Sequence, residues 1–239
     1  MLYEMQKRKD IKMKNKGKRC LLLGGLLFTA FAIWTLAVVT IDVKPVGIKG
    51  TSVGFSSLNC LFHELTGVNM TLYIITDWLG LVPVAVCMLL GAVGLIQWMK
   101  RKSIIKVDYD IILLGIYYII VILEYLLFET IPINYRPTLI NGFMEVSYPS
   151  STTLLVLSVM PTFMFQIDRR IKKTSAKKVI NTLIVVFSAF MVIGRLISGV
   201  HWLTDIVGAL LLSAGTFYIY KGVVLVIDQR NRRFRDGIS

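Results

Sequence analysis

The sequence predicts an all-α membrane protein with six transmembrane helices, a short amphipathic helix on the outer face, and both termini in the cytoplasm. Hydrophobic residues make up 55% of the 239 residues and charged residues only 17%, whereas a soluble domain of this length has a more polar surface. Six apolar runs reach or approach the roughly 20 residues that a helix needs to cross a bilayer. They are residues 20–41, 70–99, 109–129, 148–167, 179–199 and 202–227.

The first apolar run is expected to remain in the protein as a membrane anchor. It follows a basic segment, but it is too long for the core of a signal peptide and lacks a small-residue cleavage site. We therefore divide the chain into a basic cytoplasmic segment (residues 1–19), a membrane domain (20–227) and a basic cytoplasmic tail (228–239).

Basic residues are distributed unevenly between the connections. Of the 27 Lys and Arg residues, 23 lie at 1–19, 100–106, 169–178 and 221–235, and the other four are Lys44, Lys49, Arg136 and Arg195. Cytoplasmic loops carry an excess of Lys and Arg, so both termini are expected in the cytoplasm of a cell-membrane protein. The net charge of +13 then reflects topology and attraction to anionic lipid. Nucleic acid is not an expected partner.

Few ionisable or helix-breaking residues interrupt the predicted spans. Asp77 and Glu124 lie within the second and third runs, where charge is costly and often functional. Pro83 and Pro161 also lie inside runs, and neighbouring helices can accommodate the resulting kink.

The cysteine and histidine content argues against metal ligation. The three cysteines form no CxxC pair, and the chain has only two histidines. Zinc, iron–sulfur clusters and disulfides are therefore not expected. No metal and no cofactor is predicted.

The first outer loop, residues 42–69, contains helical periodicity. Its apolar residues follow the spacing i, i+3, i+4, i+7, with Ser56 or Ser57 available as an N-cap; they are Leu58, Leu61, Phe62 and Leu65. We expect a short amphipathic helix in the outer interface, with His63 as an interfacial polar residue.

The second outer loop, residues 130–149, contains two features that suit an anion. Arg136 precedes a proline, which favours extended backbone. Pro149 and the hydroxyl-bearing residues 150–153 then begin a helix, whose free N–H groups and macrodipole favour phosphate. Ordinary helix capping explains the hydroxyls equally well if the loop is considered alone.

The third outer connection reads RLISGVHWLTD, residues 195–205. Ser198-Gly199 indicates a turn, and His201 is expected to begin the sixth span. Asp205 lies four residues later, so both side chains share one helical face. The carboxylate can accept a proton from one ring nitrogen and leave the other nucleophilic. The alternative is a set of polar groups at the interface, with Arg195 extending towards water.

The three connections are more informative together than apart. Two arginines, a hydroxyl-rich helix start and a His–Asp pair are all expected at the same outer face. Arginine stays charged and can bind phosphate oxygens in a bidentate manner. The combination predicts a phosphoryl-transfer site without a metal.

These residues resemble the integral-membrane type-2 phosphatidic-acid phosphatases, which are related to the vanadium haloperoxidases. The signature of that family is K-x6-R-P, then P-S-G-H, then S-R-x5-H-x3-D. The third motif is matched by Arg195, His201 and Asp205, with Gly194 in place of serine. The second reads PSST, residues 149–152. The first keeps Arg136-Pro137, and the resemblance extends over about residues 20–227.

The resemblance implies a role for each matched residue. His201 would be the nucleophile that forms a phosphohistidine, and Asp205 would orient it. The phosphoryl oxygens would be held by Arg136, Ser150, Ser151, Arg195 and the backbone N–H groups at the helix start. The family needs no metal.

Two positions differ from the family pattern. Thr152 replaces the histidine that protonates the leaving group, a contribution commonly worth about 10²–10⁴ in rate. Glu129 replaces a phosphate-binding lysine, and a carboxylate there repels a dianion. Glu129 either turns away, pairs with Arg136 or is protonated by burial.

The expected function is a membrane lipid phosphate or diphosphate phosphatase that acts at the outer face. A diphosphate has a better leaving group than a monophosphate, so the loss of an acid at Thr152 favours an isoprenoid diphosphate of the undecaprenyl type. The alternative is a catalytically impaired relative that binds or translocates lipid phosphates. A channel or secondary transporter is disfavoured because polar residues are scarce in the spans and the halves show no repeat.

Overall fold

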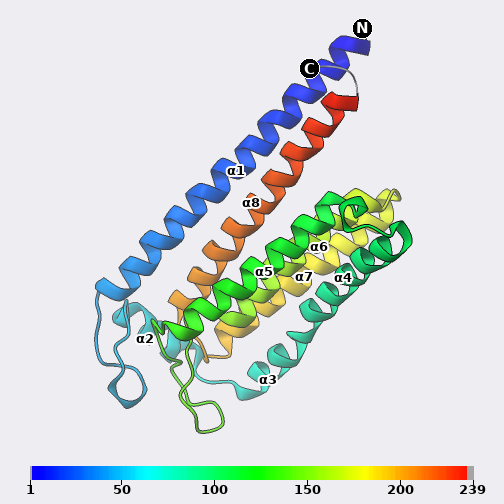
Figure 1. Ribbon diagram of the computed structural model, residues 1–239. Helices are drawn as coiled ribbons and strands as arrows, with labels where there is room; N and C mark the ends of the chain where they lie inside the picture. The colour runs from blue at the N-terminus through cyan, green and yellow to red at the C-terminus, as the bar shows by residue number, and fades with distance from the viewer. Residues whose placement is uncertain (1, 236–239) are drawn as a thin grey trace.

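The computed structural model describes residues 2–235 and the side chains of residues 16–234 (Figure 1). Within that range the regular elements are helical, apart from isolated β-bridges. The long helices are α1 (Leu2–Thr40), α4 (Leu81–Arg101), α5 (Tyr109–Thr130), α6 (Ser151–Arg170), α7 (Thr174–Ile197) and α8 (Leu203–Arg235). The shorter ones are α2 (Ser56–Thr66), α3 (Met70–Leu79) and the 3-10 helices Ile48–Gly50 and Ile104–Lys106.

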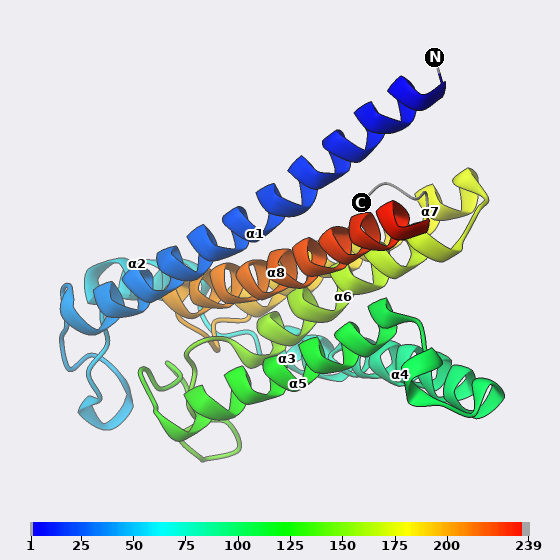
Figure 2. The same ribbon diagram turned by 45° about the horizontal axis from the view of Figure 1, so that its top comes forward.

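The helices form an elongated bundle with two distinct ends. The start of α1 and the end of α8 lie at one end, and the basic loops that join α4 to α5 and α6 to α7 face the same way (Figure 1). The opposite end carries α2, α3, the α5–α6 loop and the α7–α8 turn (Figure 2). This separation agrees with the side assignment predicted from charge, although it does not by itself orient the bundle in a membrane.

Five helical segments are long and apolar enough to cross a membrane. They are Lys16–Thr40, Met70–Arg101, Tyr109–Thr130, Thr174–Ile197 and Leu203–Phe234. The protein is therefore a polytopic membrane protein. The predicted span at 148–167 corresponds to α6, which is not among the five, so its crossing remains a prediction.

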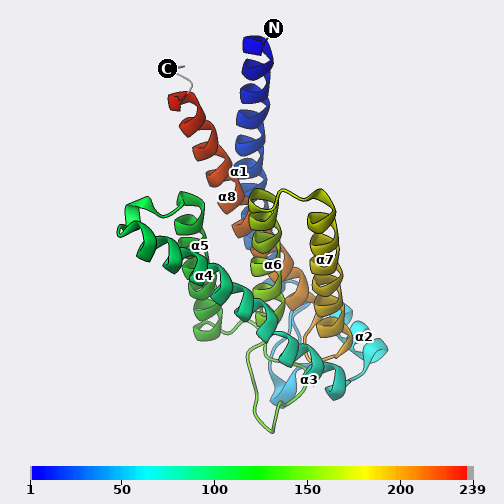
Figure 3. The same ribbon diagram turned by 90° about the vertical axis from the view of Figure 1, so that its right-hand side faces the viewer.

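The central position of α6 explains its lower hydropathy. It packs against α4, α5, α7 and α8 and lies between them in Figure 3. Its neighbours cover Ser158, Thr162 and Gln166, and Gln166 donates a 2.7 Å hydrogen bond to the hydroxyl of Tyr220. A helix enclosed by other helices needs less apolar surface than one that faces lipid.

The second predicted span, 70–99, is interrupted. Gly80 separates α3 from α4. Its backbone angles are near helical values, and its N–H donates hydrogen bonds to the carbonyls of Thr76 and Asp77. Pro83 follows in the first turn of α4, where proline is tolerated, whereas its ring would clash with the carbonyl of Leu79 in a continuous helix. The single helix expected here is thus two helices, and α3 is free to approach α7.

Helices α1 and α8 pack closely along most of their lengths. A β-carbon at Gly24 would lie 2.7 Å from a side-chain carbon of Ile219, and one at Gly222 would lie 2.8 Å from the side chain of Leu21. Gly215 faces the ring of Phe28 in the same way. Small residues let helix backbones approach closely in a membrane, so these glycines hold α1 against α8.

The amphipathic helix predicted after residue 56 is confirmed as α2. Its N-cap is Phe55, not Ser56 or Ser57, and the carboxylate of Asp42 accepts the N–H of Ser57 at 2.7 Å. The apolar side chains of α2 remain exposed, whereas Asn59 is buried against the start of α8. An exposed apolar face suits a helix that lies at the membrane surface.

The two carboxylates noted inside predicted spans have different surroundings. Glu124 accepts a 2.7 Å hydrogen bond from Thr216 on α8. Asp77 lies at the end of the bundle that carries the α7–α8 turn, next to Arg195. Only Asp77 lies close to the residues that the motifs single out.

Candidate active site

A hairpin-like loop between α5 and α6 positions Arg136. Two backbone hydrogen bonds join its two sides. The N–H of Arg136 donates to the carbonyl of Glu145 at 3.0 Å, and the N–H of Ser147 donates to the carbonyl of Asn134 at 2.9 Å. The loop reverses at Asn141–Gly142, where both residues have positive φ, as Asn-Gly turns commonly do. Arg136 is thereby held in extended backbone and is only 7% exposed.

The start of α6 is joined to α8 through the backbone. The helix begins at Ser151, as the hydroxyl-rich stretch predicts, and the N–H of Ser150 donates a 3.2 Å hydrogen bond to the carbonyl of Asp205. The hydroxyl of Ser150 donates to that of Thr153 at 3.0 Å. The second and third sequence motifs are therefore adjacent.

The turn between α7 and α8 requires glycine at one position. Gly199 has φ of +67°, and a β-carbon there would lie 1.8 Å from the carbonyl oxygen of Gly67. The turn is thus pressed against the C-terminal end of α2. His201 lies in this turn and α8 begins at Leu203, so the expectation that His201 is the first residue of the last helix is wrong by two positions.

His201 and Asp205 form a buried pair despite that offset. Nδ1 of His201 lies 3.6 Å from Oδ2 of Asp205, and the two residues are 4% and 0% exposed. The carboxylate is held by the N–H of Trp202 at 2.9 Å and the amide of Asn134 at 3.3 Å. Asn134 was not predicted, because a single amide in a loop has no distinguishing sequence pattern.

The surroundings of His201 keep its ring neutral. Burial, followed by the positive charges of Arg136 and Arg195, holds the pKa of His201 well below its ordinary value of 6.5 because each disfavours the imidazolium. A neutral imidazole retains a lone pair on the nitrogen that does not face the carboxylate. His201 is therefore in the protonation state that a nucleophile requires.

The two arginines flank one aromatic ring. The guanidinium carbon of Arg195 lies 4.9 Å from the centre of the Tyr73 ring, and that of Arg136 lies 5.7 Å from it. Cations are attracted to the faces of such rings. Tyr73 on α3 thus brings two like charges to one place. Sequence reasoning missed it, since a tyrosine in an apolar span carries no specific signal.

Each arginine also has an acidic neighbour. Nε of Arg136 lies 3.1 Å from the carboxylate of Glu145, and Nη1 of Arg195 lies 3.6 Å from that of Asp77. The arginine side chains are 8% and 1% exposed, whereas those of Glu145 and Asp77 are 41% and 57% exposed. The buried charges are thus balanced by carboxylates at the mouth of the site.

Several buried side-chain nitrogen atoms in this cluster lack a hydrogen-bond partner among the described residues. They are Nη1 of Arg136, Nε of Arg195 and both ring nitrogens of His201. Buried polar groups are nearly always satisfied, so such a set indicates a position for a ligand. Residues 16–234 contain no group of three or more His, Cys, Asp or Glu side chains that could hold a metal ion.

Comparison with known proteins identifies the family. Residues 111–229 match the sequence model of the PAP2 superfamily, a range that contains Arg136, Ser150, Arg195, His201 and Asp205. This protein belongs to the PAP2 superfamily. Comparison with curated protein sequences gives no match.

A solved structure of the same superfamily has a similar fold. It is the crystal structure of the first transmembrane PAP2-type phosphatidylglycerolphosphate phosphatase from Bacillus subtilis. The TM-score is 0.61 at 19% sequence identity, over 84% of this chain and 94% of that chain. The likeness extends beyond the matched range to the helices that precede α5.

One departure from the superfamily motifs is explained by helix packing. Gly194 stands where the motif has serine, and a β-carbon there would lie 2.8 Å from a methyl carbon of Thr76. The hydroxyl of Thr76 lies 3.5 Å from Nη1 of Arg195. Glycine therefore lets α3 pack directly against α7 beside Arg195.

The other two departures lie at the ends of α5 and α6. Glu129 is exposed near the end of α5 and makes no ion pair with a described residue. Arg136 pairs with Glu145 instead, so two of the three alternatives for Glu129, pairing with Arg136 and burial, do not apply. Thr152 lies in the first turn of α6, with its methyl carbon 3.7 Å from the position of a β-carbon on Gly80.

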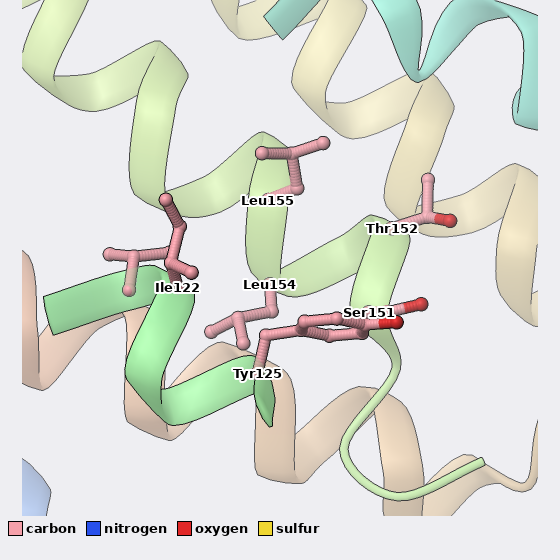
Figure 4. A pocket seen from close by; sticks show the side chains of 7 residues that line it. Ile122, Tyr125, Ser151, Thr152, Leu154 and Leu155 are labelled. Carbon is pink, nitrogen blue, oxygen red and sulfur yellow. The ribbon is translucent and has the colours of Figure 1, made fainter. Parts of the chain in front are cut away.

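An apolar groove of about 310 Å³ runs between α5 and α6 (Figure 4). Ser151 and Thr152 lie at its polar end, and its other lining residues are Val121, Ile122, Tyr125, Leu154 and Leu155. In Figure 4 the side chain of Thr152 points away from Ile122 and Tyr125. The hydroxyl-bearing start of α6 thus adjoins a surface suited to hydrocarbon.

Proposed function

We propose that this protein is a membrane lipid phosphatase that works at its outer face through a phosphohistidine on His201. Membership of the PAP2 superfamily and likeness to a membrane phosphatase support a lipid phosphatase at the general level. We further propose the phosphohistidine intermediate, the class of lipid substrate and the side of the membrane on which the reaction takes place.

The unpartnered donors around His201 carry this proposal. Two arginines and a histidine at most 7% exposed have nitrogen atoms without a hydrogen-bond partner, although Glu145 and Asp77 balance the charge of the arginines, and buried polar groups are nearly always hydrogen-bonded. A phosphoryl group would satisfy these nitrogens, because its oxygens accept bidentate hydrogen bonds from arginine. The neutral ring of His201 completes the set as nucleophile.

The reaction would proceed in two displacements at phosphorus. In the first, Nε2 of His201 attacks and the bond from phosphorus to the leaving oxygen breaks. In the second, water attacks the phosphohistidine and inorganic phosphate leaves. Asp205 acts by holding Nδ1, which keeps the ring in one tautomer and stabilises positive charge on it.

The remaining residues would bind the phosphoryl oxygens. Arg136 and Arg195 approach from the hairpin and α7, and Ser151 provides a hydroxyl and an N–H group at the start of α6. The hydroxyl of Ser150 donates to Thr153 in this structure and would turn to the phosphate when it binds. Negative charge grows on these oxygens as the leaving group departs, so donors already in place lower the barrier. No metal is assigned a role.

A lipid substrate is supported by the groove between α5 and α6. Its polar end adjoins Ser151 and its walls are apolar, so a phosphate at the arginines can be continuous with a hydrocarbon chain in the groove. Thr152 supplies no leaving-group proton near neutral pH. When a lipid diphosphate is cleaved, the leaving group is a phosphate ester, which can depart without a proton. We therefore propose that an isoprenoid diphosphate is cleaved faster than phosphatidate.

The outer location rests on the basic residues. Both basic loops and the basic ends of the chain lie opposite the cluster around His201 (Figure 1). The positive-inside rule assigns the basic end to the cytoplasm. The active site then opens to the extracytoplasmic side, within reach of outer-leaflet lipids.

Phosphate release from purified protein in lipid vesicles tests the proposal. The substrates are a polyprenyl diphosphate, phosphatidate and phosphatidylglycerolphosphate, with His201→Ala as the blank. Release above the blank is expected for at least one lipid. Tight binding of these lipids without release would favour the alternative, a non-catalytic relative that binds or translocates lipid phosphates.

A further inference from the structure

The start of α6 lacks a proton donor where the superfamily motif has histidine. Thr152 occupies that position, and a hydroxyl does not give up its proton near neutral pH. An alkyl monophosphate leaves as an alkoxide, which needs a proton as its bond to phosphorus breaks. Another group must therefore supply the proton if lipid monophosphates are cleaved.

Helix α3 brings a carboxylate to this part of the site. Thr152 lies beside Gly80, at the end of α3, with 3.7 Å between its methyl carbon and a β-carbon position on that glycine. One turn earlier, Thr76 contacts Gly194 and Arg195 on α7. Asp77 thus lies between the start of α6 and the buried arginine of α7.

The carboxylate of Asp77 lies beside Arg195, one of the two arginines proposed to bind phosphate. Its Oδ1 is 3.6 Å from Nη1 of Arg195, while its side chain is 57% exposed. A charged residue in an apolar helix is costly unless it has a function. This pair is longer than a direct hydrogen bond, so Asp77 can keep its place beside Arg195 and still interact with a ligand that Arg195 binds.

We propose that Asp77 is the general acid of the reaction, in place of the histidine that Thr152 has replaced. This inference rests on the phosphatase function proposed above. The lone pair of Nε2 of His201 forms the bond to phosphorus, and the electron pair of the breaking bond goes to the leaving oxygen. That oxygen takes the proton of Asp77, and the alcohol departs.

The second displacement restores Asp77. Water attacks the phosphohistidine and gives one proton to the Asp77 carboxylate. The bond from phosphorus to Nε2 breaks, and its electron pair returns to the ring. Inorganic phosphate leaves with the atoms and charges balanced, and the next cycle begins from the protonated acid.

Three other ionisable side chains near the site are less well placed. Glu129 lines a small pocket with Ser151, but no described contact joins it to Thr152 or to either arginine. His63 lies on α2 with its ring centre 5.6 Å from that of Trp202, and no described contact joins it to Thr152 or to either arginine. Glu145 pairs with Arg136 on the hairpin, away from α3. His63 and Glu145 serve as matched comparisons for Asp77.

The test uses two substrates with the same tail, farnesyl monophosphate and farnesyl diphosphate. Asp77→Asn keeps the shape of the side chain and removes the acid. The kcat for the monophosphate is expected to fall about 100-fold or more, whereas that for the diphosphate falls only a few-fold. Adding Thr152→His to Asp77→Asn should restore most of the monophosphate rate.

The controls separate the general acid from other roles. Glu145→Gln and His63→Gln should leave the ratio of diphosphate to monophosphate rates unchanged. An equal fall on both substrates for Asp77→Asn, or a change in the ratio for His63→Gln alone, overturns the assignment of Asp77. If the wild-type protein releases no phosphate above the His201→Ala blank, the proposed function itself is wrong.

Discussion

Nδ1 of His201 lies 3.6 Å from Oδ2 of Asp205, with both side chains buried at the N-terminal end of α8. The distance exceeds that of a strong hydrogen bond, as is often found in ligand-free active sites, where such contacts shorten when substrate binds. The pair leaves Nε2 as the nitrogen available for attack on phosphorus. The chemistry therefore depends first on these two residues.

Replacing His201 should remove turnover. His201→Ala deletes the proposed nucleophile, and the hydroxyl of Ser150 in the same cluster donates to Thr153 and has no base beside it to activate it. We expect phosphate release at the level of the blank and loss of the acid-labile, base-stable phosphoryl label that phosphohistidine gives. The matched control is His63→Ala, which removes the other histidine. Near wild-type turnover by His201→Ala would contradict the mechanism.

Replacing Asp205 should weaken turnover without unfolding the protein. Asp205→Asn keeps the shape but favours the wrong tautomer of His201, a change that lowers kcat by about 10⁴ in a comparable histidine–aspartate pair. The thermal unfolding midpoint in detergent should remain close to that of the wild type. A large fall in that midpoint would assign Asp205 a mainly structural role.

The pH dependence should report the surroundings of His201. The pKa of His201 lies well below 6.5, so the neutral ring predominates at pH 7. Activity should fall only when the pH is low enough to protonate the ring. Arg136→Gln removes a positive charge that disfavours the imidazolium. The acid limb of kcat/KM should then move to higher pH. An unchanged or lowered limb would show that Arg136 does not act on His201 electrostatically.

Cysteine labelling should determine the orientation. In a background lacking Cys20, Cys60 and Cys87, a membrane-impermeant reagent added outside intact cells should label a cysteine placed in residues 138–144. A cysteine in residues 172–175 should be labelled only after permeabilisation, since that loop is strongly basic. The reverse pattern would place the active site in the cytoplasm.

Restoring the motif histidine should narrow the substrate preference. The wild-type protein is expected to cleave an isoprenoid diphosphate faster than phosphatidate. Thr152→His adds a second acid, so it should raise the rate of phosphatidate hydrolysis more than that of diphosphate hydrolysis. The gain in the phosphatidate rate should be larger when Thr152→His is added to Asp77→Asn. Equal gains on both lipids, or a faster native reaction with phosphatidate, would contradict the leaving-group argument.

Hydropathy and charge were sufficient to predict the helices but not their interruptions. Every predicted span is helical, although residues 70–99 are divided between α3 and α4, and the amphipathic spacing of Leu58, Leu61, Phe62 and Leu65 identified α2. The break at Gly80 was missed because a proline inside an apolar run is compatible with either a kink or a new helix start. Packing decides between these, and here α3 packs against Gly194 on α7.

Motif spacing predicted the residues at the centre of the site, and the structure brings them together. It could not predict Tyr73, Asn134 or Glu145, because each acts through a contact made by another segment. Asp77 carried a usable signal, since an ionisable residue within a span is unusual. Its position beside Arg195 depends on the break that sequence reasoning missed.

The glycines between α1 and α8 make the alignment of the reacting groups depend on a distant contact. Asp205 is in the first turn of α8, and Gly215 and Gly222 on the same helix meet Phe28 and Leu21 of α1. An extra methyl group there would push the helices apart, and a misplacement of about 1 Å can cost 10²-fold in rate. α1 precedes the residues that match the superfamily model, yet its packing against α8 helps to fix the position of Asp205.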